Sequence, residues 1–119
     1  MRAARLGRSV VLVEKTNAFG GVATNGMVIA WHSKMDTEFG RQILAGLTTE
    51  VMERLASRNA VEIVENNPHW GYRFNPQELK IELDQLVLES GIQPLLHTGY
   101  CRPLIDNGTV EAVLIENKD

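Results

Sequence analysis

The sequence has little cysteine and no long apolar run. Cys101 is the single cysteine in 119 residues, so one chain can form neither an intramolecular disulfide nor a zinc or redox site built on paired thiols. This usage favours a reducing, cytoplasmic setting, where Cys101 is expected as a half-buried strand residue. No stretch reaches the roughly 18 apolar residues that span a bilayer, and no charged segment followed by an apolar core opens the chain. We therefore expect no membrane partner.

The sequence also lacks an excess of positive charge. Its 12 Lys and Arg residues are outnumbered by 15 Asp and Glu, which gives a formal net charge of -3, and no basic stripe is present. A nucleic-acid partner is therefore not expected. His32, His69 and His97 are scattered without the spacing of a metal site, so we expect no metal. No Ser-His-Asp or Cys-His arrangement can be argued, and no catalytic residue is assigned.

Apolar runs and helix boundary signals predict one α/β domain. Residues 9–14, SVVLVE, form a continuous apolar run that is typical of a strand buried on both faces of a parallel sheet. Residues 1–6 before it are predicted as the end of a helix that Gly7 terminates. Residues 15–26 are predicted as a loop. The chain is long enough to bury one core.

Two amphipathic helices are predicted to pack on the sheet. The first covers residues 37–58, where apolar residues recur at spacings of three and four, and Asp36 or Thr37 is expected to cap it. A short apolar patch follows at 61–64, and residues 67–70 are predicted as a turn with an aromatic anchor.

The second helix has stronger signals. Asn75 is expected as its cap, Pro76 as its first helical residue and Gly91 as its stop, so the helix covers residues 76–90. Residues 92–98 are predicted as the next strand, which makes this helix a crossover between two parallel strands. Residues 100–117 are predicted as an antiparallel hairpin that turns at Asn107-Gly108.

The end of the first strand carries the pattern of a dinucleotide site. Glu14 closes the apolar run, and the pair Gly20-Gly21 follows it. In a dinucleotide-binding unit, an acid at this place accepts hydrogen bonds from ribose hydroxyls and lies about 20 residues after a GxGxxG turn. That distance reaches back before Met1. We therefore expect the chain to be a piece of such a unit, with the glycine-rich turn encoded upstream.

Several stretches together resemble the FAD-dependent oxidoreductase family, whose flavin domain is of the glutathione-reductase type. The resemblance covers nearly the whole chain, in order and with similar spacing. It is carried by AARLGRSVVLVEKTNAFGGVATNGMV (3–28), FGRQILAGLTTEVMERL (39–55), FNPQELKIELDQLVLESGI (74–92), LLHTG (95–99) and NGTVEAVLIENK (107–118). The resemblance implies a partial Rossmann-like FAD-binding domain, and complete relatives pass a hydride between a substrate and flavin N5.

The resemblance also implies which residues contact FAD. Glu14 matches the acid that binds ribose, and Lys15 matches a position beside the adenosine. Gly20 and Gly21 match a glycine pair of the family, whose missing side chains let the backbone approach the pyrophosphate and ribityl chain. Ala23 and Thr24 continue that loop. Tyr100 falls near the adenine contact, where valine is more common. Trp31 and His32 follow this loop, and loop packing is favoured for them over a flavin or substrate contact.

Two parts of the family pattern are missing from these residues. Neither the GxGxxG turn nor the later strand with an Ala-Thr-Gly-type motif is present, so the sequence gives weak support to FAD binding by this chain alone. The alternative is a small non-catalytic module that self-associates or binds another protein through exposed sheet edges. The open edge of strand 9–14 predicts a homodimer or higher oligomer. A start codon placed too late, or a cloned fragment, would also explain the pattern. The sequence does not identify the substrate.

Overall fold

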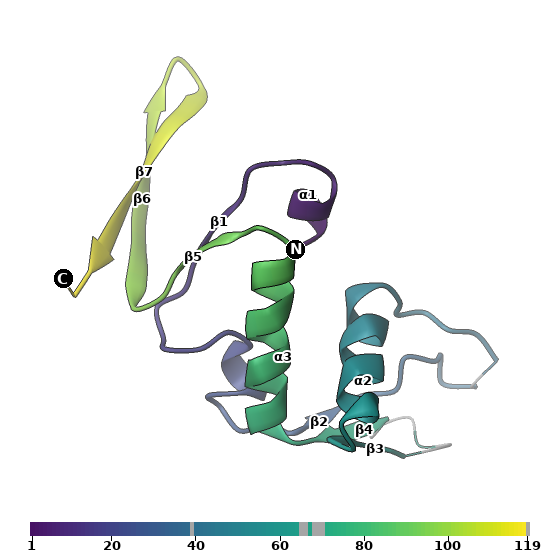
Figure 1. The fold of residues 1–119 in the computed structure, drawn as a ribbon. Helices are drawn as coiled ribbons and strands as arrows, with labels where there is room; N and C mark the ends of the chain where they lie inside the picture. Colours follow the sequence, from purple (N-terminus) through teal and green to yellow (C-terminus); the bar gives the residue numbers. More distant parts are fainter. Residues whose placement is uncertain (39, 65–66, 68–70, 119) are drawn as a thin grey trace.

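The computed structural model describes residues 1–38, 40–64, 67 and 71–118 (Figure 1). These residues form a mixed α/β fold with a parallel strand pair, three α-helices and a C-terminal antiparallel hairpin, which confirms the predicted fold class. The elements in chain order are α1 (Arg2–Arg5), β1 (Val11–Val13), the 3₁₀ helix η1 (Gly21–Ala23), β2 (Ala30–Trp31), α2 (Leu47–Ser57), β3 (Val61–Ile63), β4 (Tyr72–Phe74), α3 (Pro76–Glu89), β5 (Gln93–Leu95), β6 (Thr98–Asp106) and β7 (Thr109–Asn117).

β1 and β5 form the predicted parallel pair. Val11 lies opposite Gln93 and Val13 lies opposite Leu95, and α3 is the crossover helix that precedes β5. Both strands are shorter than predicted. Burial of β1 on both faces was wrong, because Val11 is 53% exposed. Among the described strands β1 pairs with β5 alone, so its other edge is open.

α3 begins at Pro76, as predicted, and ends at Glu89, one residue before the predicted end. The side-chain oxygen of Asn75 accepts hydrogen bonds from the backbone N–H groups of Gln77, at 2.9 Å, and Glu78, at 3.4 Å. Proline costs nothing at the first helical position, where its missing N–H would have no intrahelical partner. Gly91 follows the helix with φ 63°, a left-handed conformation that ends it. Gly7, with φ 79°, does the same after α1.

The first long helix is shorter than predicted. α2 begins at Leu47 and not at residue 37, because Gly46 has φ 74° and ψ -126°, which are not helical angles. The Asp36 carboxylate accepts a hydrogen bond from the backbone N–H of Gly40 at 2.9 Å, so it stabilises a turn instead of capping a helix. Ile43, one of the apolar residues whose spacing predicted this helix, lies in the loop before α2 and is 61% exposed.

A second, antiparallel sheet was not predicted. Its strand order is β2, β4, β3, and the apolar patch at 61–64 supplies β3. Trp31 of β2 contacts Phe74 of β4 edge to face, with ring centroids 4.9 Å apart. Residue 71, just before β4, must be glycine, because a Cβ at this position would lie 2.5 Å from Ser33 Cα. The predicted turn at 67–70 and its His69 lie, except for Asn67, outside the described residues.

The helices pack against each other more than against the parallel pair. Leu55 of α2 and Leu79 and Leu86 of α3 are fully buried in one core cluster, while Ile92, next to β5, belongs to a second cluster. α2 contacts α3 and β3, and α3 contacts β5, so the expectation that both helices cover one parallel sheet was wrong for α2. No helix in the described ranges has the length and apolar character that a bilayer crossing requires.

The hairpin of β6 and β7 extends away from the helices (Figure 1). Asn107, with φ 46°, and Gly108, with φ 78°, form its turn, as predicted. Bulges interrupt the pairing after Tyr100 and after Leu104. Cys101 lies on β6 but is exposed, so its predicted half-burial was wrong. The apolar side chains near it are exposed because no described element covers the hairpin faces.

Candidate functional site

Glu14 is held in place at the carboxyl end of β1. Its backbone N–H donates to the carbonyl of Leu95 at 2.9 Å, and its carbonyl accepts from the backbone N–H of Thr98 at 3.0 Å. The side chain is half-buried. The end of β5 and the start of β6, both distant in sequence from β1, therefore fix the position from which this carboxylate projects.

Thr16 stabilises the ionised form of the Glu14 carboxylate. Glu14 Oε1 accepts hydrogen bonds from the Thr16 hydroxyl at 2.6 Å and from the Thr16 backbone N–H at 2.7 Å. These bonds stabilise the charged form, and they lower the pKa of Glu14 below its usual value. At neutral pH the group is an anion that only accepts hydrogen bonds.

A shallow hollow lies next to Glu14 on the hairpin side. Its volume is about 280 Å³, and it brings together Lys15, His97, Gly99, Glu116, Asn117 and Lys118. The base of β7 reaches this place because Asn117 Nδ2 donates to the buried hydroxyl of Thr98 at 3.0 Å. Lys15 thus lines the hollow beside Glu14, whereas Tyr100 lies farther along β6 with 61% of its surface exposed.

Gly20 and Gly21 have different surroundings, although they are neighbours. A Cβ on Gly20 would lie 2.5 Å from Thr24 Cγ2 and 2.9 Å from Leu83 Cδ1, whereas a Cβ on Gly21 would meet nothing within 4 Å. Gly20 is therefore required by packing inside the loop. Gly21 leaves open space over its backbone, as a close approach by a ligand would require.

Thr24 shapes the loop from inside. Its side chain is fully buried, and its hydroxyl donates to the carbonyl of Phe19 at 2.7 Å. Asn25 Nδ2 in turn donates to the Thr16 hydroxyl at 2.9 Å, which links this loop to the Glu14 turn. Thr24 therefore acts as a support for the loop, whereas Ala23 is partly buried and packs against the core cluster of α2 and α3.

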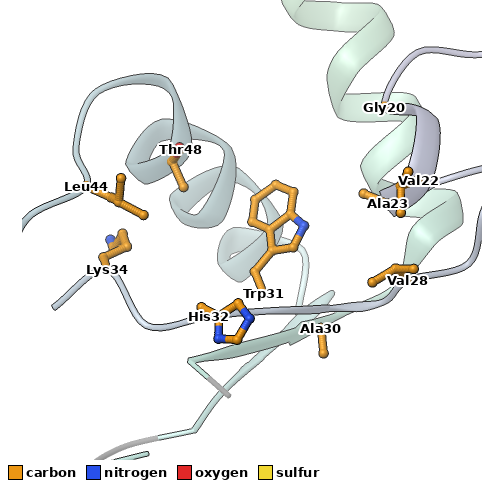
Figure 2. A pocket seen from close by; sticks show the side chains of 10 residues that line it. All are labelled: Gly20, Val22, Ala23, Val28, Ala30, Trp31, His32, Lys34, Leu44 and Thr48. Carbon is orange, nitrogen blue, oxygen red and sulfur yellow. The ribbon is translucent and has the colours of Figure 1, made fainter. Parts of the chain in front are cut away.

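A larger cavity that the sequence did not reveal adjoins the same loop. Its volume is about 640 Å³, and most of the described residues that line it are apolar. In Figure 2 the Trp31 indole stands between Ala23 and Val28 on one side and Lys34 and Leu44 on the other. Trp31 packs on Phe74, as expected, but from strand β2 rather than from a loop, and Trp31 and His32 also line the cavity.

The described residues fit the adenosine half of FAD. An anionic acceptor at the end of a parallel strand suits ribose hydroxyls, and the open face of Gly21 admits a chain of atoms close to the backbone. The N-terminus of α3 is not open to the pyrophosphate, because the Asn75 side chain already accepts hydrogen bonds from backbone N–H groups of its first turn. Among the described residues, no group of three or more His, Cys, Asp or Glu could hold a metal ion.

Comparison with known proteins gives one clear relationship. A family model described as FAD dependent oxidoreductase matches residues 1–119, the whole length of the chain. No curated protein matches the chain. The match covers β1, the glycine loop, both long helices and the hairpin, so it includes each residue that the sequence associated with a flavin.

Proposed function

The chain belongs to the FAD-dependent oxidoreductase family, and we propose on this basis that it holds the adenosine half of FAD at the carboxyl end of β1. The observation that carries the proposal is the position and charge of Glu14, which two backbone hydrogen bonds fix and whose ionised form Thr16 stabilises. In the complete flavin site, bound FAD would exchange a hydride with the substrate. The residues of this chain bind and orient the cofactor.

Each residue in the proposed site has a physical role. Both hydrogen bonds from Thr16 to the Glu14 carboxylate end on Oε1, so Oε2 is the atom that would accept from ribose hydroxyls. Lys15 would lie beside the adenosine, in the hollow it already lines. Gly21 and Ala23 would face the cofactor, while Gly20 and Thr24 maintain the loop conformation that exposes them.

A flavin titration tests this proposal. The fluorescence of FAD should be quenched saturably by the purified chain. Glu14→Ala should weaken binding about tenfold, because the ionised carboxylate makes a stronger hydrogen bond to a ribose hydroxyl than the water that would replace it. Glu14→Gln, which keeps the shape and loses the charge, should fall between the two. Glu111→Gln on the exposed hairpin removes the same charge elsewhere and should change nothing.

Two results would contradict the proposal in different ways. Unchanged FAD affinity in Glu14→Ala would show that this carboxylate does not hold the ribose. No quenching of FAD by the unmodified chain at high concentration would show that these residues alone do not form a flavin site.

A second function is favoured by the exposed edges. The outer edge of β1 is open among the described strands, and exposed apolar side chains occur there and along both strands of the hairpin. An open apolar edge pairs readily with another strand. We propose, as the alternative, a non-catalytic module that self-associates through this edge as a homodimer or higher oligomer.

A further inference from the structure

The cavity beside Trp31 has the size and lining of a small-molecule site. Its volume of about 640 Å³ lies within the range of ligand pockets, and such pockets combine an apolar wall with a few polar groups. Here Ala23, Val28, Trp31 and Leu44 provide apolar surface. This surface would exclude water from an apolar ligand body and would not discriminate strongly among such bodies.

Among the described residues that line this cavity, Lys34 carries the full charge. Its Nζ lies 3.4 Å from the Thr49 hydroxyl oxygen and 5.4 Å from the centre of the Tyr72 ring. Within the described part of the chain, no carboxylate forms an ion pair with it, and none lines the cavity. The ring and the hydroxyl hold the ammonium group without neutralising it.

An ammonium group beside apolar surface favours one class of ligand. Partial removal from water weakens its hydration, and an anionic group on a ligand would restore that loss with a charge-assisted hydrogen bond. His32 and Thr48 add polar groups to the same lining. A neutral apolar ligand would leave the Lys34 charge uncompensated.

We propose that this cavity binds an amphipathic small molecule whose apolar body packs on Trp31 and whose carboxylate or sulfonate pairs with Lys34. The inference goes beyond the flavin proposal, because it requires no flavin and because the cavity shares no lining residue with the hollow beside Glu14. Of the residues in the flavin proposal, Gly20 and Ala23 of the glycine loop also line this cavity, but the ligand is held by Trp31 and Lys34. Lys34 is on the loop after β2 and Leu44 on the loop before α2, so only the folded chain assembles this site (Figure 2).

Tryptophan fluorescence tests the proposal directly. Trp31 and Trp70 are the two tryptophans of the chain, so Trp70→Phe leaves Trp31 as the reporter. Anilinonaphthalene sulfonate, an aromatic anion, should quench Trp31 saturably in this background. Lys34→Gln should weaken its binding about tenfold, which corresponds to the loss of one charge-assisted contact. Lys34→Arg should retain binding.

Matched controls separate the charge from the apolar cavity. Lys80→Gln on α3 removes the same charge away from the cavity and should leave affinity unchanged. Phenylnaphthylamine, the uncharged counterpart of the probe, should bind more weakly than the sulfonate and should not respond to Lys34→Gln. Equal binding of both probes, equal effects of Lys34→Gln and Lys80→Gln, or no quenching of Trp31 would each overturn the proposal.

Discussion

Gly20 and Gly21 are neighbours with different roles: Gly20 allows close packing inside the protein, and Gly21 leaves the backbone open to a ligand. Both have positive φ, at 101° and 49°. The space for a Cβ on Gly20 is occupied by Thr24 and Leu83, whereas Gly21 faces open space. A substitution at either glycine strains the backbone, but only one of them also collides with the interior.

Alanine at these two glycines should therefore have unequal effects. Gly20→Ala should lower the free energy of unfolding by about 3 kcal/mol, because backbone strain adds to a steric clash. Gly21→Ala should cost about 1 kcal/mol, from the left-handed backbone alone. Urea denaturation of both variants measures the difference. Equal losses would contradict the packing role assigned to Gly20.

Charged side chains connect the helices to one another. Arg5 of α1 donates to Glu50 of α2 at 2.8 Å, and Arg54 donates to Glu50 at 2.9 Å and to Glu89 of α3 at 2.6 Å. On the same helix pair, the almost fully buried Glu82 accepts from Arg58 at 2.9 Å. The side of the α2–α3 contact that carries these groups is thus stabilised by paired charges rather than by apolar contacts.

The pH dependence of stability should reveal this network. The hydrogen bond from Arg5, followed by that from Arg54, lowers the pKa of Glu50 from 4.5 to about 2. A group with a lowered folded-state pKa contributes fully above its unfolded value, so this contribution is present above about pH 4.5 and disappears as the pH falls through about 2. Glu50→Gln should cost about 1 kcal/mol at pH 7, because solvent screens partly exposed pairs.

Thermal unfolding over a pH series measures this effect. Below about pH 2 the stability of Glu50→Gln should converge with that of the unmodified chain. Glu53→Gln, an exposed change on the same helix, should leave the profile unaltered. A constant difference at every pH would mean that Glu50 stabilises α2 without relying on its charge.

The described chain is extended for its length. Its radius of gyration is 17.0 Å, compared with about 13.5 Å expected for a compact domain of this size. The protruding hairpin contributes to this shape, and its side chains Tyr100, Ile105 and Val110 are about 60% exposed (Figure 1). Exposed apolar surface at this scale is typical of an interaction surface.

Self-association through β1 predicts a mass above that of one chain. Size-exclusion chromatography with light scattering should show a dimer or higher oligomer, and Val11→Lys should shift it toward the monomer, because charge on an edge strand opposes pairing. Leu88→Lys, which places the same charge on an exposed part of α3, should have no effect. A monodisperse monomer for the unmodified chain would rule out this alternative.

Local sequence determined the elements whose signals lie within a few residues. The Asn75-Pro76 start of α3, the Asn107-Gly108 turn and the left-handed glycine after α1 are set by side-chain hydrogen bonds or backbone sterics of those residues. The placement of Glu14 at the end of a strand, and membership of the family, were likewise evident from order and spacing. The helical spacing of apolar residues after Asp36 predicted a helix that starts too early, because Gly46 adopts a non-helical conformation and α2 begins only at Leu47.

Only the tertiary structure decided which residues meet. The three-residue strands β3 and β4 are too short to have a clear local pattern. They pair with each other, and β2, which is distant in sequence, completes the sheet by pairing with β4. In the folded chain Trp31 and Lys34 line one cavity with Gly20 and Ala23 of the glycine loop, and Leu83 of α3 lies against Gly20 but not against Gly21. The reason is physical: propensity, capping and turns act over a few residues, whereas burial and cavity formation depend on surfaces that meet only when the chain has folded.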